Sequence, residues 1–198
     1  MEIAARFVRL VTAFALISCV VGAVHARAQI PAFDRKHYEN EKYQFSVDLP
    51  QGFVACVSEH TNHGVVIYLD RAVQCRDEHE GVAYVEISAN YNSSEVRTLA
   101  RLARISCGPS PFEPASRRVE WVRGATLGGR RAAGCRQYFK DGDVSVSIII
   151  LRKTDGPVSG WIEVSAYLRT TLDRYQGDLR IFRRVLKTVW IHPDGPDD

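Results

Sequence analysis

An alternation of apolar and polar residues predicts strands along most of the chain. Between Tyr43 and Leu49 the apolar residues fall at every second position, which is the period of a half-buried strand, and Pro50 and Gly52 end it. The same period predicts strands over residues 63–70 and 81–90. The face expected to be buried in the second of these carries Ala83, Val85, Ile87 and Ala89.

Two segments instead repeat their apolar residues at helical spacing. Side-chain oxygens in residues 92–95 can accept from orphan backbone N–H groups, so a helix is expected to open there and to end at Cys107-Gly108-Pro109. Its apolar positions are Val96, Leu99, Ala100 and Ala103, with Arg97, Arg101 and Arg104 on another side. A final helix is predicted from the apolar stripe Leu172, Tyr175, Leu179, Phe182, Leu186 and Val189, opposite Arg174, Arg180, Arg183, Arg184 and Lys187.

Between the two helices the pattern returns to strands and tight turns. Strands are predicted over residues 117–126, 130–140, 144–153 and 161–169, joined by turns at 128–129, 141–142 and 155–157. Strands followed by a helix, repeated twice, predict an α+β fold, with a largely antiparallel sheet of about six or seven strands packed by two helices. Trp121 and Trp161 are expected to fill the core, and Trp190 to close one end of the final helix.

The first 28 residues read as a signal peptide. Arg6 and Arg9 precede an uncharged apolar run of about fifteen residues, and Ala26-Arg27-Ala28 offers small residues for cleavage after Ala28. The run is shorter than the roughly twenty residues of a membrane-spanning helix. An alternative stays open, because Leu16-Ile17-Ser18-Cys19 resembles the bacterial lipobox. We therefore expect a periplasmic or secreted protein, attached to a membrane only if Cys19 is lipidated.

Cleavage after Ala28 leaves a nearly neutral chain. It removes three arginines and one glutamate from 26 basic and 23 acidic residues, which leaves 23 and 22 and a net charge of +1. A nucleic-acid partner is not expected, because such proteins carry a strong basic footprint. The predicted organisation is an irregular lead-in over residues 29–42, a single domain over 43–192 and a disordered tail over 193–198.

The spacing of apolar residues and turns resembles that of PsbP-like domains. The opening Tyr-x-Phe-x-Val-x-Leu-Pro-x-Gly-Phe, from Tyr43 to Phe53, is similar to the start of these domains. The Gly-Gly-x-x-Ala turn at 128–132, the Asp-Gly hairpin, the strand with Trp161 and the end of the final helix are similar as well. The resemblance implies an accessory or binding module without catalysis. Four cysteines after the leader are a departure from the group, so no subfamily role is carried over.

Those four cysteines, Cys56, Cys75, Cys107 and Cys135, are expected to form two disulfides. An even set in an exported chain reads as disulfides, although the sequence allows three connectivities. Cys56–Cys75 with Cys107–Cys135 is favoured, because the first bridge would close the loop before the strand at residue 63. The second would tie the proline-rich loop to a neighbouring strand.

Catalytic and metal signatures are weak. There is no Gly-x-Ser-x-Gly elbow, His-Glu-x-x-His pair, phosphate loop or dinucleotide fingerprint. His60, His63 and His79 lie near Cys56 and Cys75, but their spacing matches no standard zinc site, and oxidation would consume both thiolates. We expect neither metal nor cofactor. An envelope hydrolase or a metal-binding protein that uses the three histidines remains the alternative.

The sequence thus predicts a non-enzymatic envelope protein that binds a protein partner or a ligand. Two loops flanked by cysteines are the candidate contact surfaces, because crosslinking would reduce the entropy lost on binding. Their candidate residues are His60, Asn62 and His63 in one loop and Pro111 and Phe112 in the other. A narrower hypothesis is an immunity-type inhibitor that plugs the active site of an exported toxin.

Overall fold

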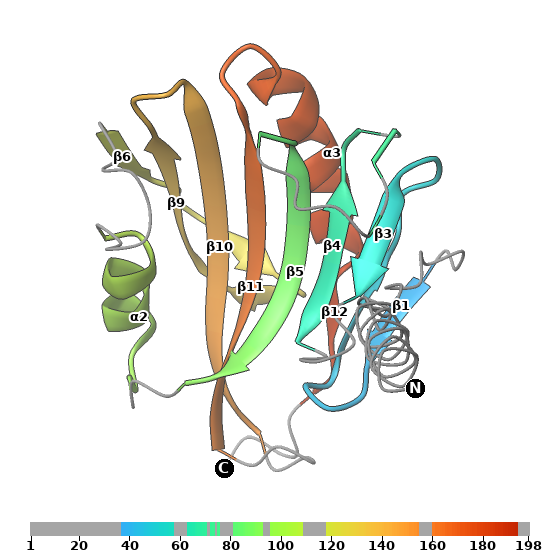
Figure 1. Cartoon of the computed structure of the whole chain (residues 1–198). Coiled ribbons are helices and arrows are strands. Elements are labelled where there is room, and N and C mark those ends of the chain that lie inside the picture. The colour runs from blue at the N-terminus through green and yellow to red at the C-terminus, as the bar shows by residue number, and fades with distance from the viewer. Residues whose placement is uncertain are drawn as a thin grey trace, which may run out of the picture.

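The computed structural model describes residues 37–57, 63–70, 72–73, 75, 81–92, 96–108, 118–154 and 160–193. Its centre is a seven-stranded antiparallel sheet in the order β3-β4-β5-β11-β10-β9-β6 (Figure 1). In chain order the strands are β3 (Val54–Val57), β4 (Gly64–Tyr68), β5 (Tyr84–Tyr91), β6 (Arg118–Trp121), β9 (Ala133–Tyr138), β10 (Asp143–Thr154) and β11 (Gly160–Thr171). The predicted α+β class with a largely antiparallel sheet is confirmed.

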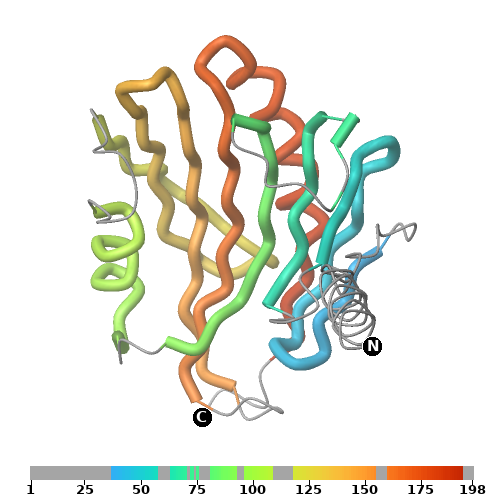
Figure 2. Tube along the Cα trace, in the orientation of Figure 1, coloured from blue at the N-terminus to red at the C-terminus, as the bar shows by residue number. Residues whose placement is uncertain are grey.

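Strands β10 and β11 pair over their full length and form the middle of the sheet (Figure 2). Successive side chains of a strand point to opposite faces, and β10 is buried on both. Val144, Val146, Ile148 and Ile150 join the main core, which α3 (Tyr175–Thr188) covers on one face. On the other face Ile149 packs with Leu102 of α2 (Leu99–Ser106) in a small separate cluster. The two helices therefore cover opposite faces.

A three-stranded sheet, in the order β1-β2-β12, lies beside α3. It consists of β1 (His37–Asn40), β2 (Phe45–Asp48) and β12 (Trp190–Ile191). The irregular lead-in predicted over residues 29–42 is therefore wrong for 37–40. Only Tyr38 and Asn40 are buried in β1, and Asn40 is held by polar bonds. Its amide donates to the Tyr38 hydroxyl at 2.8 Å and accepts from the Tyr43 N–H at 3.0 Å, so hydrophobic periodicity does not reveal this strand.

The first predicted helix begins later than expected. Its N-cap is Thr98, whose hydroxyl accepts from the Arg101 N–H, and not a residue of the 92–95 segment. The Asn92 side chain instead donates to the Val96 carbonyl and accepts from the Val96 N–H, ahead of the helix. Polar side chains can bond nearby backbone groups without capping a helix, which is why the sequence predicts the start of this helix too early.

The tryptophans are not in the core. Trp121, Trp161 and Trp190 are 56%, 39% and 50% exposed, so the expectation for Trp121 and Trp161 is wrong. Trp121 lies on the edge strand β6, and its register partner is Cys135, on the face away from α3. The side chain of Trp161 points to the face opposite to that of its neighbour Ile162, which is fully buried in the core. An apolar residue in a strand is buried only where its face is covered.

Both disulfides form in the favoured connectivity. Cys56 is bonded to Cys75, with Cα atoms 5.6 Å apart, and Cys107 to Cys135, with Cα atoms 6.1 Å apart. Cys107 ends α2 and Cys135 lies in β9, so the second bridge fastens the helix to the sheet. It joins a strand to a helix end, where the sequence suggested a loop.

Gly64 at the start of β4 is required by a close backbone approach. A Cβ atom at this position would lie 2.0 Å from the Ile87 carbonyl oxygen and 2.6 Å from the Ser88 Cα. Backbone atoms of a central strand cannot yield, so Gly64→Ala is expected to lower the free energy of unfolding by about 3 kcal/mol. Urea unfolding measures this. Gly177→Ala in α3, where a Cβ meets nothing, should instead stabilise by about 0.5–1 kcal/mol. Equal effects of the two variants would contradict this account.

Candidate functional site

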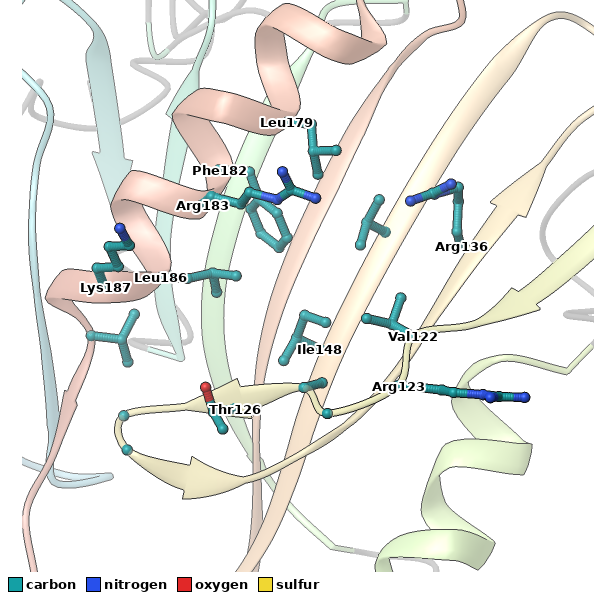
Figure 3. Close-up of a pocket in the computed structure, with 16 residues that line it drawn as sticks. Val122, Arg123, Thr126, Arg136, Ile148, Leu179, Phe182, Arg183, Leu186 and Lys187 are labelled. Carbon is teal, nitrogen blue, oxygen red and sulfur yellow. The ribbon is translucent and has the colours of Figure 1, made fainter.

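A cavity of about 440 Å³ lies between α3, the α3-facing side of β9 and β10, and the hairpin of β7 (Thr126–Leu127) and β8 (Arg130–Arg131) (Figure 3). We call it the α3 cavity. Its volume falls in the range of small-molecule sites. Its floor is apolar and consists of Val146, Ile148, Leu179, Phe182, Leu186 and Val189.

The periods of two elements bring this floor together. Val146 and Ile148 are alternate residues of β10, and Leu179, Phe182 and Leu186 recur at helical steps on the sheet-facing side of α3. Besides β10 and α3, the β7–β8 turn forms a wall of the cavity. Gly128 there has φ of +57°, and a Cβ on it would lie 2.7 Å from Ile191, so glycine lets the turn approach β12. This contact positions the turn over the floor.

Basic side chains surround the apolar floor. Arg183 and Lys187 are exposed on α3, one helical turn apart, and Arg136 lies on β9 opposite them. The guanidinium groups of Arg136 and Arg183 extend toward one another across the cavity, whereas that of Arg123 extends away from it (Figure 3). None of the described residues that line the cavity is acidic. The site is therefore electropositive over an apolar base.

Arg136 is the best anchored of these cations. Its Nη1 donates to Glu120 and to the Tyr138 hydroxyl, both at 3.2 Å, and its guanidinium lies 5.0 Å from the ring centre of Tyr175. The Arg136 Nε–H and the Tyr175 hydroxyl are nevertheless buried without a hydrogen-bond partner among the described residues. Burial raises the pKa of Tyr175, against the opposing effect of Arg136, so its hydroxyl keeps its proton. The Nε–H of Arg136, which lines the cavity, thus has no acceptor among the described residues, and neither has the hydroxyl of Tyr175, which packs against Arg136 outside the lining.

The opposite face of the sheet carries a second depression of about 300 Å³, which we call the polar hollow. Its lining is mostly hydroxyl, amide and carboxylate groups, from Tyr84, Glu86, Ser88, Gln137, Ser147, Glu163, Ser165 and Tyr167. The Ser88 and Ser165 hydroxyls are hydrogen-bonded at 3.2 Å, and the rings of Tyr84 and Tyr167 are 5.9 Å apart. Ser145 and Ser147 of β10 lie on this face of the sheet and are buried there, so β10 is buried on both faces.

Burial raises the pKa of Glu163 in the polar hollow. The folded state therefore holds a proton that the unfolded chain releases at lower pH, and stability falls as pH rises through the folded pKa. Glu163→Gln removes this loss, so its stability advantage over the natural chain should be absent below about pH 4 and grow as pH rises from there. Urea unfolding at a series of pH values tests this. Parallel pH profiles for the two proteins would refute it.

Most of the sequence-predicted contact residues lie outside the described residues. These are His60 and Asn62 of one loop, Pro111 and Phe112 of the other, and His79 of the metal alternative. His63 is described: its Nδ1 is hydrogen-bonded to the Asn90 side chain, and its ring lies 5.4 Å from that of Tyr43. Among the described residues no group of three metal-ligating side chains occurs. Cys56 and Cys75 are bonded to each other and offer no thiolate.

The α3 cavity is not predicted by the sequence. Two features of the sequence relate to this cavity. Arg183 and Lys187 border the apolar stripe of the final helix, and Gly128 with Gly129 marks a tight turn. Basic residues beside an apolar helix stripe are usually solvated, however, and the turn cannot be placed over the helix from sequence. None of the helices in the described part of the chain is long and apolar enough to cross a bilayer.

No protein-family model matches the sequence, and no curated protein sequence matches it. Two of the solved structures with a similar fold illustrate the likeness. One is LpqN, involved in cell envelope biogenesis of Mycobacterium tuberculosis, with 14% identity, coverage of 75% of this chain and 83% of that chain, and a TM-score of 0.49. The other is cyanobacterial PsbP from Synechocystis sp. PCC 6803, with 12% identity, coverage of 86% and 98%, and a TM-score of 0.47. The second belongs to the group that the sequence resembles, and the similarity concerns the fold alone.

Proposed function

We propose that this chain is an exported, non-enzymatic accessory module of the cell envelope that binds a small ligand in the α3 cavity. The observation that carries the proposal is the cavity itself, an apolar floor of six side chains with basic groups around it. The two disulfides support export, because such bonds persist in oxidising compartments. The predicted leader over residues 1–28, which lies outside the described residues, supports it as well.

Native mass spectrometry tests the binding function. The full chain is expressed with its leader in a bacterium, recovered from the periplasmic fraction, and weighed under native and denaturing conditions. We expect a small molecule that is retained only in the native state. Leu186→Trp, which fills the cavity from its floor, should abolish retention. The matched control is Ile181→Trp, because Ile181 is also partly buried on α3 but borders a different depression, beside Leu49 and Phe53.

The outcomes separate clearly. Retention by the natural chain and by Ile181→Trp, together with loss in Leu186→Trp, supports the cavity. No retained molecule in the natural chain, or equal retention in all three, contradicts it. Recovery from the cytosolic fraction with the leader attached and all five cysteines as titratable thiols would contradict export.

The narrower hypothesis of an immunity-type inhibitor concerns a different surface. It would use the loops at residues 60–64 and 108–114, and purification from an envelope extract would have to yield a toxin as the bound partner. The alternative enzyme or metal protein would use His60, His63 and His79, and metal analysis of the purified chain tests it. Bound zinc with free thiols would favour that alternative.

A further inference from the structure

We infer that the ligand of the α3 cavity is an anionic amphiphile, with an alkyl chain on the apolar floor and a carboxylate or phosphate group between Arg136 and Arg183. This inference rests on the proposed function, since it names the chemical class of the ligand for the same cavity. Three independent features of the site support it: the composition of the floor, the charge at its edge, and the two donors without an acceptor.

The apolar floor of the cavity favours a ligand with an alkyl chain. All six of its side chains are aliphatic or aromatic, and Val146, Ile148 and Phe182 are almost fully buried. The hydroxyl groups of a sugar or another polar molecule would find no hydrogen-bond partner on this floor, and polar groups that lose water without gaining a partner are costly. Apolar contact is the only interaction that this floor offers. The ligand must therefore present an alkyl or comparable apolar surface to it.

The basic residues at the edge of the cavity favour a negatively charged group on the ligand. Arg183 and Lys187 lie one helical turn apart, where like charges repel, and neither forms an ion pair with a described residue. The same helix neutralises another arginine, because Arg174 pairs with Asp178 one turn later at 3.5 Å. Arg180 and Arg184 of this helix also form no ion pair with a described residue, but neither lines the α3 cavity, and Arg183 is the arginine of α3 that does. An anionic group there would interact with Arg183 and Arg136 from opposite walls, as Figure 3 shows.

The donors without partners indicate where the acceptor belongs. The Arg136 Nε–H and the Tyr175 hydroxyl are buried without acceptors among the described residues, and the Arg136 guanidinium lies 5.0 Å from the ring centre of Tyr175. Glu120 accepts a hydrogen bond from Nη1 of Arg136, whereas the Nε–H of Arg136 has no acceptor among the described residues. A buried donor without a partner destabilises the folded state, so an acceptor beside Arg136 is favoured. Carboxylate and phosphate oxygens accept from an arginine fork in the required geometry.

Displacement of a fluorescent fatty acid measures the selectivity. A dansyl-labelled fatty acid is bound to the purified full chain and displaced with palmitate, hexadecyl phosphate, hexadecanol or inorganic phosphate. We expect palmitate and hexadecyl phosphate to displace it, hexadecanol to be at least about tenfold weaker, and inorganic phosphate to fail. If hexadecanol displaced the probe as well as palmitate does, the inference that the head group is anionic would be wrong. Displacement by inorganic phosphate alone would overturn the amphiphile.

Charge removal on α3 supplies the matched variants. Arg183→Gln is expected to raise the Kd for palmitate about tenfold and to leave that for hexadecanol unchanged. Arg180→Gln, the same change at an exposed position of the same helix that does not line the cavity, should alter neither. Lys187→Gln is a second test if Arg183→Gln unfolds, and thermal melts verify folding. Equal losses in Arg183→Gln and Arg180→Gln would overturn the placement of the head group.

The two levels of the proposal fail differently. If the natural chain retains a small molecule in native mass spectrometry but binds neither the dansyl probe nor palmitate, the amphiphile inference is wrong and the binding function stands. If the chain retains nothing and binds no probe, both are wrong.

Discussion

Replacing Cys107 and Cys135 with alanine is expected to lower the free energy of unfolding by about 3.5 kcal/mol and to release α2 from the sheet. The bridge closes a segment with a sequence separation of 28, and the chain-entropy relation gives a value of this size for such a loop. The local effect follows from the helix itself. An eight-residue helix is too short to persist alone, and its cluster with the sheet has only Val96, Leu102 and Ile149 as buried members.

Hydrogen exchange and urea unfolding measure the two effects separately. The Cys56→Ala/Cys75→Ala variant is the matched control, because its loop has a separation of 19 and should cost about 3 kcal/mol. Its bridge lies at β3, away from α2, so the amides of α2 should keep their protection. We expect fast exchange in α2 only in the Cys107→Ala/Cys135→Ala variant. Protection of α2 in both variants would show that packing alone retains the helix.

Arg152→Met is expected to lower the free energy of unfolding by about 3 kcal/mol, because Arg152 connects three segments of the chain. It is only 2% exposed. Its Nη1 donates to the backbone oxygens of Gln44 and His192, at 3.5 and 3.1 Å, and its Nη2 donates to the Gln44 side chain at 3.1 Å. Hydrogen bonds from a charged donor contribute about 1.5–3 kcal/mol each, and methionine leaves these acceptors buried without that donor.

This arginine also supports an unusual backbone conformation. Gln44 has φ of +54°, a conformation that residues other than glycine rarely adopt, and Thr154 donates to the same side-chain oxygen at 3.0 Å. The control for Arg152→Met is Lys153→Met, at the next residue of β10, which is exposed on the other face. Thermal and urea unfolding should show a large loss only for Arg152→Met. Similar stability of the two variants would mean that the network contributes little.

The framework of the fold was predictable because it depends on local periodicity. Alternation in β5 placed Val85 and Ile87 on the buried face, and the helical steps around Phe182 predicted α3. Polar burial was not predictable in this way. Arg152 lies inside because the distant Gln44 and His192 accept its hydrogen bonds, and Asn40 lies inside because it is hydrogen-bonded to Tyr38 and Tyr43. Trp121 lies outside although it stands in a strand.

The candidate site depends on proximity between distant segments, which a single sequence does not encode visibly. Gly128 in a turn, Ile148 in a strand and Phe182 in a helix meet at one cavity. Each has a sufficient local explanation, as a turn former or a core residue. Only the placement of α3 against the sheet shows that Arg136 and Arg183 face each other across the cavity, so their shared role required the structure.

The double burial of β10 restricts how the length of the chain can change. Val146 and Ile148 line the α3 cavity, while Ser147 and Ile149 line the polar hollow on the reverse face. Inserting one residue within this strand would exchange the two linings, placing serines against Phe182 and aliphatic chains among the polar groups. Inserting two residues would restore the alternation. Insertions and deletions tolerated within β10 should therefore come in even numbers.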